Sequence, residues 1–233
     1  MAGTKSTENE QSRADHEAGH FVAAYSTGIL TSPIWVTIEP RGDDGGSTFL
    51  RRLEDAPLSS VLHYYLGGIM AEGVGRILRR HSKSPPSEAD FREELAHAVP
   101  QAFRDGGHGD AARIEALRKK TPSSLWPDIA DFRWQTFNLL SEHWERVQLI
   151  SAALVKHKTL YQSEPSYLVM TYDKPEPLKT HLSKLYLDYR NNKQPIPAPE
   201  GWYDGATPEQ RKKPFCEGPV EYVRRVYPGA LEA

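Results

Sequence analysis

Cysteine is nearly absent from this chain of 233 residues, since Cys216 is the only one. A single cysteine excludes a disulfide within the chain and any zinc cluster built on several cysteines. Long apolar runs are also missing, and no stretch approaches the roughly 18 residues that cross a bilayer. The polar stretch 1–13 contains no apolar core of a signal peptide. We therefore expect a soluble, cytoplasmic protein with no membrane span.

An excess of charge of either sign is absent too. The chain carries 29 Lys and Arg residues against 31 Asp and Glu residues, a net charge of -2. Nucleic-acid-binding proteins usually show a strong basic excess, so we expect no nucleic-acid partner. A phosphate-binding loop of the G-x-x-x-x-G-K-[ST] type is missing, so the chain is not expected to unfold a substrate with ATP.

What the sequence does contain is an H-E-x-x-H string at 16–20, inside a helical pattern. His16 and His20 are four residues apart and share one helix face, so both imidazoles can point at one ion. Zinc binds histidine nitrogens and keeps an open position for water in catalytic sites. Glu17 would lie beside that water and could take its proton. The string predicts a zinc site with a glutamate base.

Helical periodicity dominates the rest of the chain. Alternation of apolar and polar residues predicts a strand over 33–41, followed by a turn and a short partner strand over 47–53. Four glycines in the second long helix indicate places where a neighbouring helix lies close. Helices are predicted over about 8–27, 57–80, 87–104, 110–120, 127–161 (one helix or two) and 178–189.

The order of several motifs resembles the peptidase domain of the FtsH family. That family consists of zinc metalloproteases usually fused behind a membrane anchor and an AAA+ ATPase. The likeness covers about residues 13–165. Its matching segments are H-E-A-G-H at 16–20, W-V-T-I-E-P-R-G at 35–42, L-G-G-I-M-A-E-G-V-G at 66–75, S-E-A-D-F at 87–91 and the helical stretch 143–164.

The resemblance implies a mostly α (α+β) fold, a helical zincin-like peptidase domain with a small β-sheet. This domain is expected over 1–165, and 166–233 is expected to be an extension with one helix and a proline-rich irregular segment. The resemblance further implies Zn²⁺ as cofactor, bound by His16, His20 and Asp90. Glu17 would act as general base on a water that attacks a peptide carbonyl.

Other residues remain candidates for parts of this site. Asp90 follows Ser87 by three residues, where an acidic residue also caps a helix. His81, Glu88 and His97 are alternative third ligands. Glu72 could orient a zinc-bound histidine, or could be a surface carboxylate.

The expected substrate is an unfolded or flexible polypeptide, delivered in some cases by a separate partner. The stretch 47–51 is a candidate edge strand that receives an extended peptide by backbone pairing. The proline-rich tail over 191–233 is expected to lie over the domain and limit access to the zinc. Two rival hypotheses are a catalytically idle or latent domain that serves as a binding or regulatory module, and a soluble regulatory protease that cuts one specific partner.

Overall fold

The computed structural model divides the chain into two compact units, Met1–Leu160 and Tyr161–Ala233. The sequence analysis placed this boundary after residue 165. The residues that the structure describes, to which all statements below apply, are 3–29, 35–39, 46–50, 53–84, 86–105, 108–161, 163–192, 219–227 and 229. The expected tail contact falls mainly on 193–218 and lies outside the described residues.

The first unit is mostly helical with a small sheet, which confirms the predicted fold class. The sheet has three strands in the order β2-β1-β3, and β1 and β2 pair antiparallel with Val36 opposite Thr48. Its elements are α1 (Gly3–Ser26), β1 (Trp35–Thr37), β2 (Ser47–Phe49), α2 (Leu58–Arg80), α3 (Glu88–Asp105), α4 (His108–Lys120), α5 (Ile129–Glu142), α6 (Trp144–His157) and β3 (Thr159–Tyr161), the last residue of which begins the second unit.

Local signals account for most of these helix boundaries. Gly28 follows α1 with φ +78°, a conformation that favours glycine, and its N–H donates to the carbonyl of Tyr25. Ser87 caps α3, because its hydroxyl accepts from the N–H of Asp90. The stretch predicted as one helix or two is two, and the break lies at His143.

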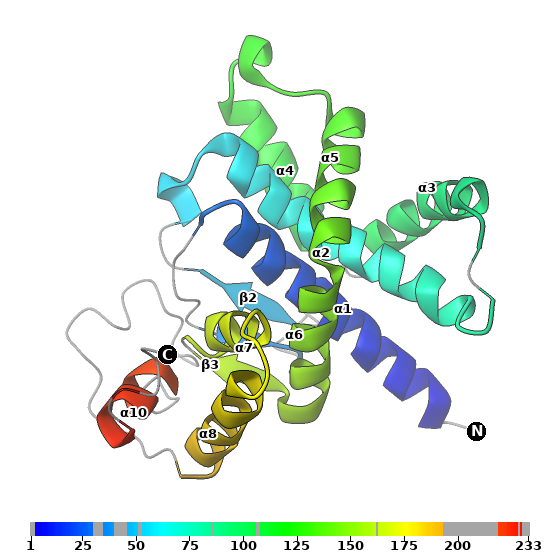
Figure 1. Cartoon of the computed structure of the whole chain (residues 1–233). Coiled ribbons are helices and arrows are strands. Elements are labelled where there is room, and N and C mark those ends of the chain that lie inside the picture. The colour runs from blue at the N-terminus through cyan, green and yellow to red at the C-terminus, as the bar shows by residue number, and fades with distance from the viewer. Residues whose placement is uncertain are drawn as a thin grey trace. The chain divides into compact units, whose positions relative to one another are not determined.

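Helices α1 and α2 lie side by side in close contact at the centre of the first unit (Figure 1). A Cβ added at Gly19 of α1 would clash with the carbonyl oxygen of Gly67 on α2. A Cβ at Gly67 would in turn lie 2.7 Å from the carbonyl oxygen of Gly19. The glycines therefore allow the two backbones to touch, which agrees with the predicted role of the α2 glycines.

A buried carboxylate also ties α1 to its neighbours. Asp15 accepts a hydrogen bond from the Ser151 hydroxyl of α6 at 2.6 Å and forms an ion pair with Arg79 of α2. A Cβ at Gly75 would clash with the Asp15 carboxylate. This network fixes the rotation of α1 about its own axis. The direction in which the next residue, His16, points from the helix is thereby fixed as well.

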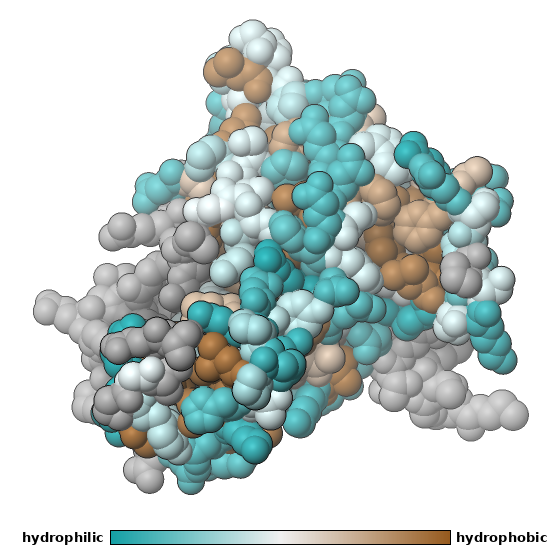
Figure 2. Space-filling model, viewed as in Figure 1, coloured by the Kyte–Doolittle hydropathy of each residue, from teal (hydrophilic) through white to brown (hydrophobic). Residues whose placement is uncertain are grey.

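On the outer side of this unit, α3 contacts α2 and α5, and the rings of Phe91 and Phe137 lie 5.9 Å apart. Figure 2 shows an apolar hollow where these helices meet. Leu78 of α2 and Trp134 of α5 are among the large apolar side chains that remain exposed.

The second unit contains two helices that the sequence analysis did not predict. Helix α7 (Glu164–Tyr172) has Pro165 in its first turn, a position where proline's fixed φ favours a helix. Helix α10 (Pro219–Val226) lies in the segment predicted as irregular, so that part of the prediction was wrong. With α8 (Leu178–Asn192), these helices enclose a core rich in tyrosine: Tyr167, Leu182, Leu185, Tyr186, Tyr189, Tyr222 and Val223.

A buried ion pair completes this second core. The Glu164 carboxylate is fully buried and lies 2.6 Å from the Arg190 guanidinium. Its other oxygen accepts from the backbone N–H of Tyr161. Among the residues that the structure describes, no helix of either unit is long and apolar enough to cross a membrane.

Candidate metal centre

Three residues of the H-E-x-x-H string lie side by side on the buried face of α1. His16, Glu17 and His20 retain only 8%, 5% and 4% of their surface exposed. The four-residue spacing places the two imidazoles on one face, and their ring centroids are 4.6 Å apart. Charged and polar side chains are seldom buried to this extent without a specific role or partner.

A carboxylate from another helix meets both imidazoles. Oδ2 of Asp110, in the first turn of α4, lies 3.0 Å from Nε2 of His16 and 3.1 Å from Nε2 of His20. The three ligand atoms all lie within 4.8 Å of one another. This buried His-His-Asp group could hold a metal ion.

The opposite nitrogen of each imidazole has its own acceptor. Nδ1 of His20 lies 2.7 Å from the Tyr64 carbonyl oxygen, which can only accept, so Nδ1 carries the proton. Nδ1 of His16 lies 3.0 Å from Oε2 of Glu72 in the same way. Both rings therefore turn Nε2 toward Asp110, as a metal site requires of its histidines.

Helix α2 supplies the space as well as these acceptors. A Cβ added at Gly68 would lie 2.5 Å from Nε2 of His20. Any larger residue would displace the imidazole, so glycine at this position is a condition for the arrangement. Glu72 is in turn held by Arg76, 2.5 Å away on the next turn.

The charges of the group strongly perturb its titration. Burial lowers the pKa of His16, but the hydrogen bonds to Asp110 and Glu72 outweigh burial and raise that pKa well above its usual value. Burial raises the pKa of Asp110, but His20 and His16 more than offset this and hold it far below its usual value. Without a metal, positive charge on His16 thus balances the carboxylate.

Glu17 lies next to this group and is held by the sheet. Its pKa is raised, because burial outweighs the opposing effects of His20, His16 and a hydrogen bond from Thr48. That hydrogen bond joins the Thr48 hydroxyl to Oε2 of Glu17 at 2.7 Å. A carboxylate of raised pKa beside a potential metal site is the form that general bases take.

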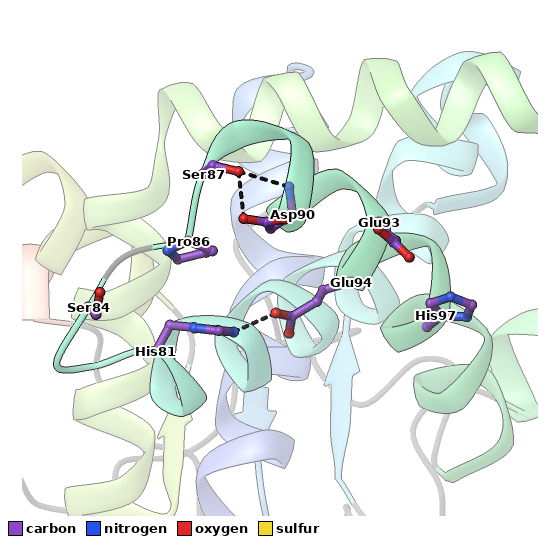
Figure 3. A pocket seen from close by; sticks show the side chains of 8 residues that line it. All are labelled: His81, Ser84, Pro86, Ser87, Asp90, Glu93, Glu94 and His97. Atoms are coloured by element: carbon purple, nitrogen blue, oxygen red, sulfur yellow. Dashed lines mark hydrogen bonds and ion pairs between the residues drawn. The ribbon is translucent and has the colours of Figure 1, made fainter.

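Asp90, the predicted third ligand, lies elsewhere. It is exposed at the start of α3, where its carboxylate accepts a hydrogen bond from Ser87 at 2.6 Å (Figure 3). It lines an open pocket of about 520 Å³ between the end of α2 and α3. The expectation for Asp90 is therefore corrected: Asp110 occupies the position beside the histidines, and Asp90 bonds Ser87, the residue that caps α3.

The alternative third ligands are also away from the histidine pair. His81 contacts Glu94 at 2.5 Å and, with His97, lines the same pocket as Asp90 (Figure 3). Glu88 is exposed and pairs with Arg92. In the described part of the chain, Asp110 is the residue that joins His16 and His20 in a group of possible ligands.

The sequence did contain a signal for Asp110. In the FtsH family, which the motifs resemble, a threonine-glycine-alanine lead precedes the aspartate, and Ser84-Pro85-Pro86 departs from it. The segment Gly106-Gly107-His108-Gly109 before Asp110 is closer to such a lead of small residues. Within the predicted helix 110–120, nothing else sets Asp110 apart from an ordinary first-turn carboxylate.

The donor set suits zinc. Two imidazole nitrogens and one carboxylate oxygen are three ligands of the kinds that catalytic zinc sites use, leaving a fourth position open. The hydrogen-bonded Nδ1 atoms supply the outer support that such ligands need. The sequence matches no known protein-family model and no curated protein.

Proposed function

We propose that this protein is a zinc-dependent metallopeptidase similar to the peptidase domain of the FtsH family, with His16, His20 and Asp110 as ligands. One observation carries the proposal: a buried His-His-Asp group has the Glu17 carboxylate of the same helix beside it. A purely structural cluster would not need a second buried carboxylate, held by Thr48, next to the first. These residues provide the metal ligands and the base of the proposed peptide hydrolysis.

The proposed chemistry divides its tasks among these residues. A zinc ion held here would act as a Lewis acid on the peptide carbonyl and would acidify the attacking water. Glu17 takes the proton of that water as the new carbon–oxygen bond forms. It then gives this proton to the leaving nitrogen as the carbon–nitrogen bond breaks. Asp110 and the two histidines would hold the ion. Glu72 and the Tyr64 carbonyl fix the orientation of the imidazole rings.

The proposed substrate is an extended polypeptide. Strand β2 is at one edge of the sheet, with β1 as its neighbour. Thr48 of β2 contacts Glu17, so a peptide pairing with this strand would run past the base. A folded protein presents few extended segments, so unfolded or flexible chains, whether free or delivered by a partner, are the proposed substrates.

The test is hydrolysis of an unfolded casein-type substrate by the purified protein loaded with one equivalent of zinc. We expect cleavage that 1,10-phenanthroline abolishes and added Zn²⁺ restores. Absence of cleavage at full zinc loading would refute the peptidase proposal for this form of the protein. The rival of an idle or latent domain would then replace it.

A further inference from the structure

Thr48 contacts both the carboxylate and the backbone carbonyl of Glu17. Its side chain is buried on β2, and its hydroxyl oxygen lies 2.7 Å from Oε2 of Glu17 and 3.1 Å from the Glu17 backbone carbonyl oxygen. A carboxylate and a carbonyl only accept, so the hydroxyl must be the donor. Its single proton goes best to the nearer, charged oxygen, where a hydrogen bond is stronger and shorter.

The strand that carries Thr48 is itself anchored to the metal site. The Tyr64 hydroxyl donates to the Thr48 carbonyl oxygen at 2.6 Å. The Tyr64 carbonyl oxygen accepts from Nδ1 of His20 at 2.7 Å. These bonds form a closed circuit that runs from Glu17 through Thr48 and Tyr64 to His20, and returns along one turn of α1. The position of the base relative to a proposed ligand is thus determined by side chains rather than by the helix alone.

The other oxygen of Glu17 lies beside Gly46, the residue that precedes β2. A Cβ added at Gly46 would lie 2.8 Å from Oε1 of Glu17 and 2.9 Å from the Thr37 carbonyl oxygen. The backbone before β2 therefore passes as close to the carboxylate as a residue without a side chain permits. Thr48 holds one oxygen, and Gly46 leaves space beside the other.

We propose that Thr48 is the positioning residue of the general base, an inference that rests on the proposed peptidase function. Its hydroxyl fixes Oε2 of Glu17 and leaves Oε1 to take the proton from water and return it to the leaving nitrogen. Because Thr48 belongs to the edge strand β2, the base is tied to the strand on which a peptide would pair. Misplacing a reacting group by about 1 Å can slow a reaction roughly 100-fold.

On a simpler hypothesis, Thr48 is a buried strand residue with no role in positioning Glu17. The variants distinguish this hypothesis from the positioning role. Thr48→Ser and Thr48→Ala both lose the methyl group, and they differ from each other only in the hydroxyl. Thr37 offers a matched control in the same sheet. Its hydroxyl is also buried, and it bonds the Thr159 hydroxyl at 2.7 Å, the Lys158 carbonyl oxygen and the Glu39 N–H. Thr37→Ser and Thr37→Ala therefore remove a comparable hydrogen bond away from the base.

The measurements are kcat and KM on a fluorogenic peptide, zinc affinity, and affinity of the zinc-loaded protein for a peptide hydroxamate that hydrogen-bonds to the base. A hydrogen bond to a charged group corresponds to about a 10- to 100-fold effect. We expect Thr48→Ala to lower kcat at least about 10-fold relative to Thr48→Ser, with KM and zinc affinity little changed. Hydroxamate affinity should fall with kcat. The Thr37 pair should differ in thermal stability alone.

Equal kcat in Thr48→Ser and Thr48→Ala would overturn the positioning role, as would an equal fall in the Thr37 pair. If Thr48→Ala does not fold, Thr48→Val is compared with the wild type instead. Valine removes the hydroxyl and keeps the branched shape that strands favour. A zinc-loaded wild-type protein that cleaves no peptide refutes the peptidase function, and the role of Thr48 falls with it. If the wild type is active and Thr48→Ser and Thr48→Ala have equal kcat, only the positioning role is refuted.

Discussion

Nδ1 of His16 lies 3.0 Å from Oε2 of Glu72, a residue 56 positions further along the chain. Both side chains are buried, and Glu72 is also held by Arg76. The contact fixes the ring orientation of His16 and makes its Nε2 atom more basic, and Nε2 is the atom that faces Asp110. Glu72 is thus a supporting group of the candidate metal centre, and not the surface carboxylate that its sequence context equally allowed.

Replacing Glu72 should therefore weaken metal binding without removing a ligand. We expect Glu72→Ala to lower zinc affinity about 10- to 100-fold, the usual effect of losing such a support. Competition with a chromophoric chelator measures this affinity. Glu93→Ala, which removes an exposed carboxylate from α3, is the control and should bind zinc like the wild type. Equal affinity in the two variants would show that Glu72 does not support the site.

The assignment of the third ligand gives a second prediction. Asp110→Asn should lose zinc at concentrations that saturate the wild type, because an uncharged amide is a poor replacement for a carboxylate ligand. Asp90→Asn should retain one zinc per chain, since Asp90 only bonds Ser87 at the start of α3. Elemental analysis after dialysis distinguishes them. The double variant His16→Ala, His20→Ala should be empty, and metal content unchanged in it would end the zinc proposal.

The proposed base gives a third prediction. Glu17→Gln keeps the shape of the side chain and can still accept from Thr48, but cannot take up a proton. We expect zinc content and thermal stability close to those of the wild type, with peptide cleavage lowered by about 10² to 10⁴-fold. Initial rates on the unfolded substrate provide the measurement. Turnover equal to that of the wild type would assign the base to another residue.

Close packing of α1 on α2 gives a fourth prediction, independent of catalysis. Gly19→Ala places a methyl group against the Gly67 carbonyl and should destabilise the fold by about 1–3 kcal/mol. Gly73→Ala on α2 is the matched control, since its nearest neighbour would be Val99 at an ordinary 3.5 Å. Alanine's helix preference should leave that variant neutral or up to about 1 kcal/mol more stable. Urea unfolding measures both, and equal midpoints would contradict the packing argument.

Local features of the sequence were enough to predict much of the first unit. The i, i+4 spacing of His16 and His20 places both on one helix face whatever surrounds the helix. Gly28 ends α1 and Ser87 begins α3 through bonds to residues three or four positions away. Glycine at position 67 indicated a close neighbour, because few other roles suit glycine inside a helix. Each of these inferences depends on contacts within a few residues.

The tertiary structure alone decided between Asp90 and Asp110. Both are acidic residues in the first turn of a helix, where the helix dipole favours a negative charge, so local physics treats them alike. Asp110 becomes a partner of His16 across 94 residues because α4 packs on α2 beside the histidine face of α1. The Thr48–Glu17 bond likewise needs the sheet to meet α1. Helical spacing placed the two imidazoles on one face, but only the packing of distant helices and strands determined which nitrogen each ring presents and what it faces.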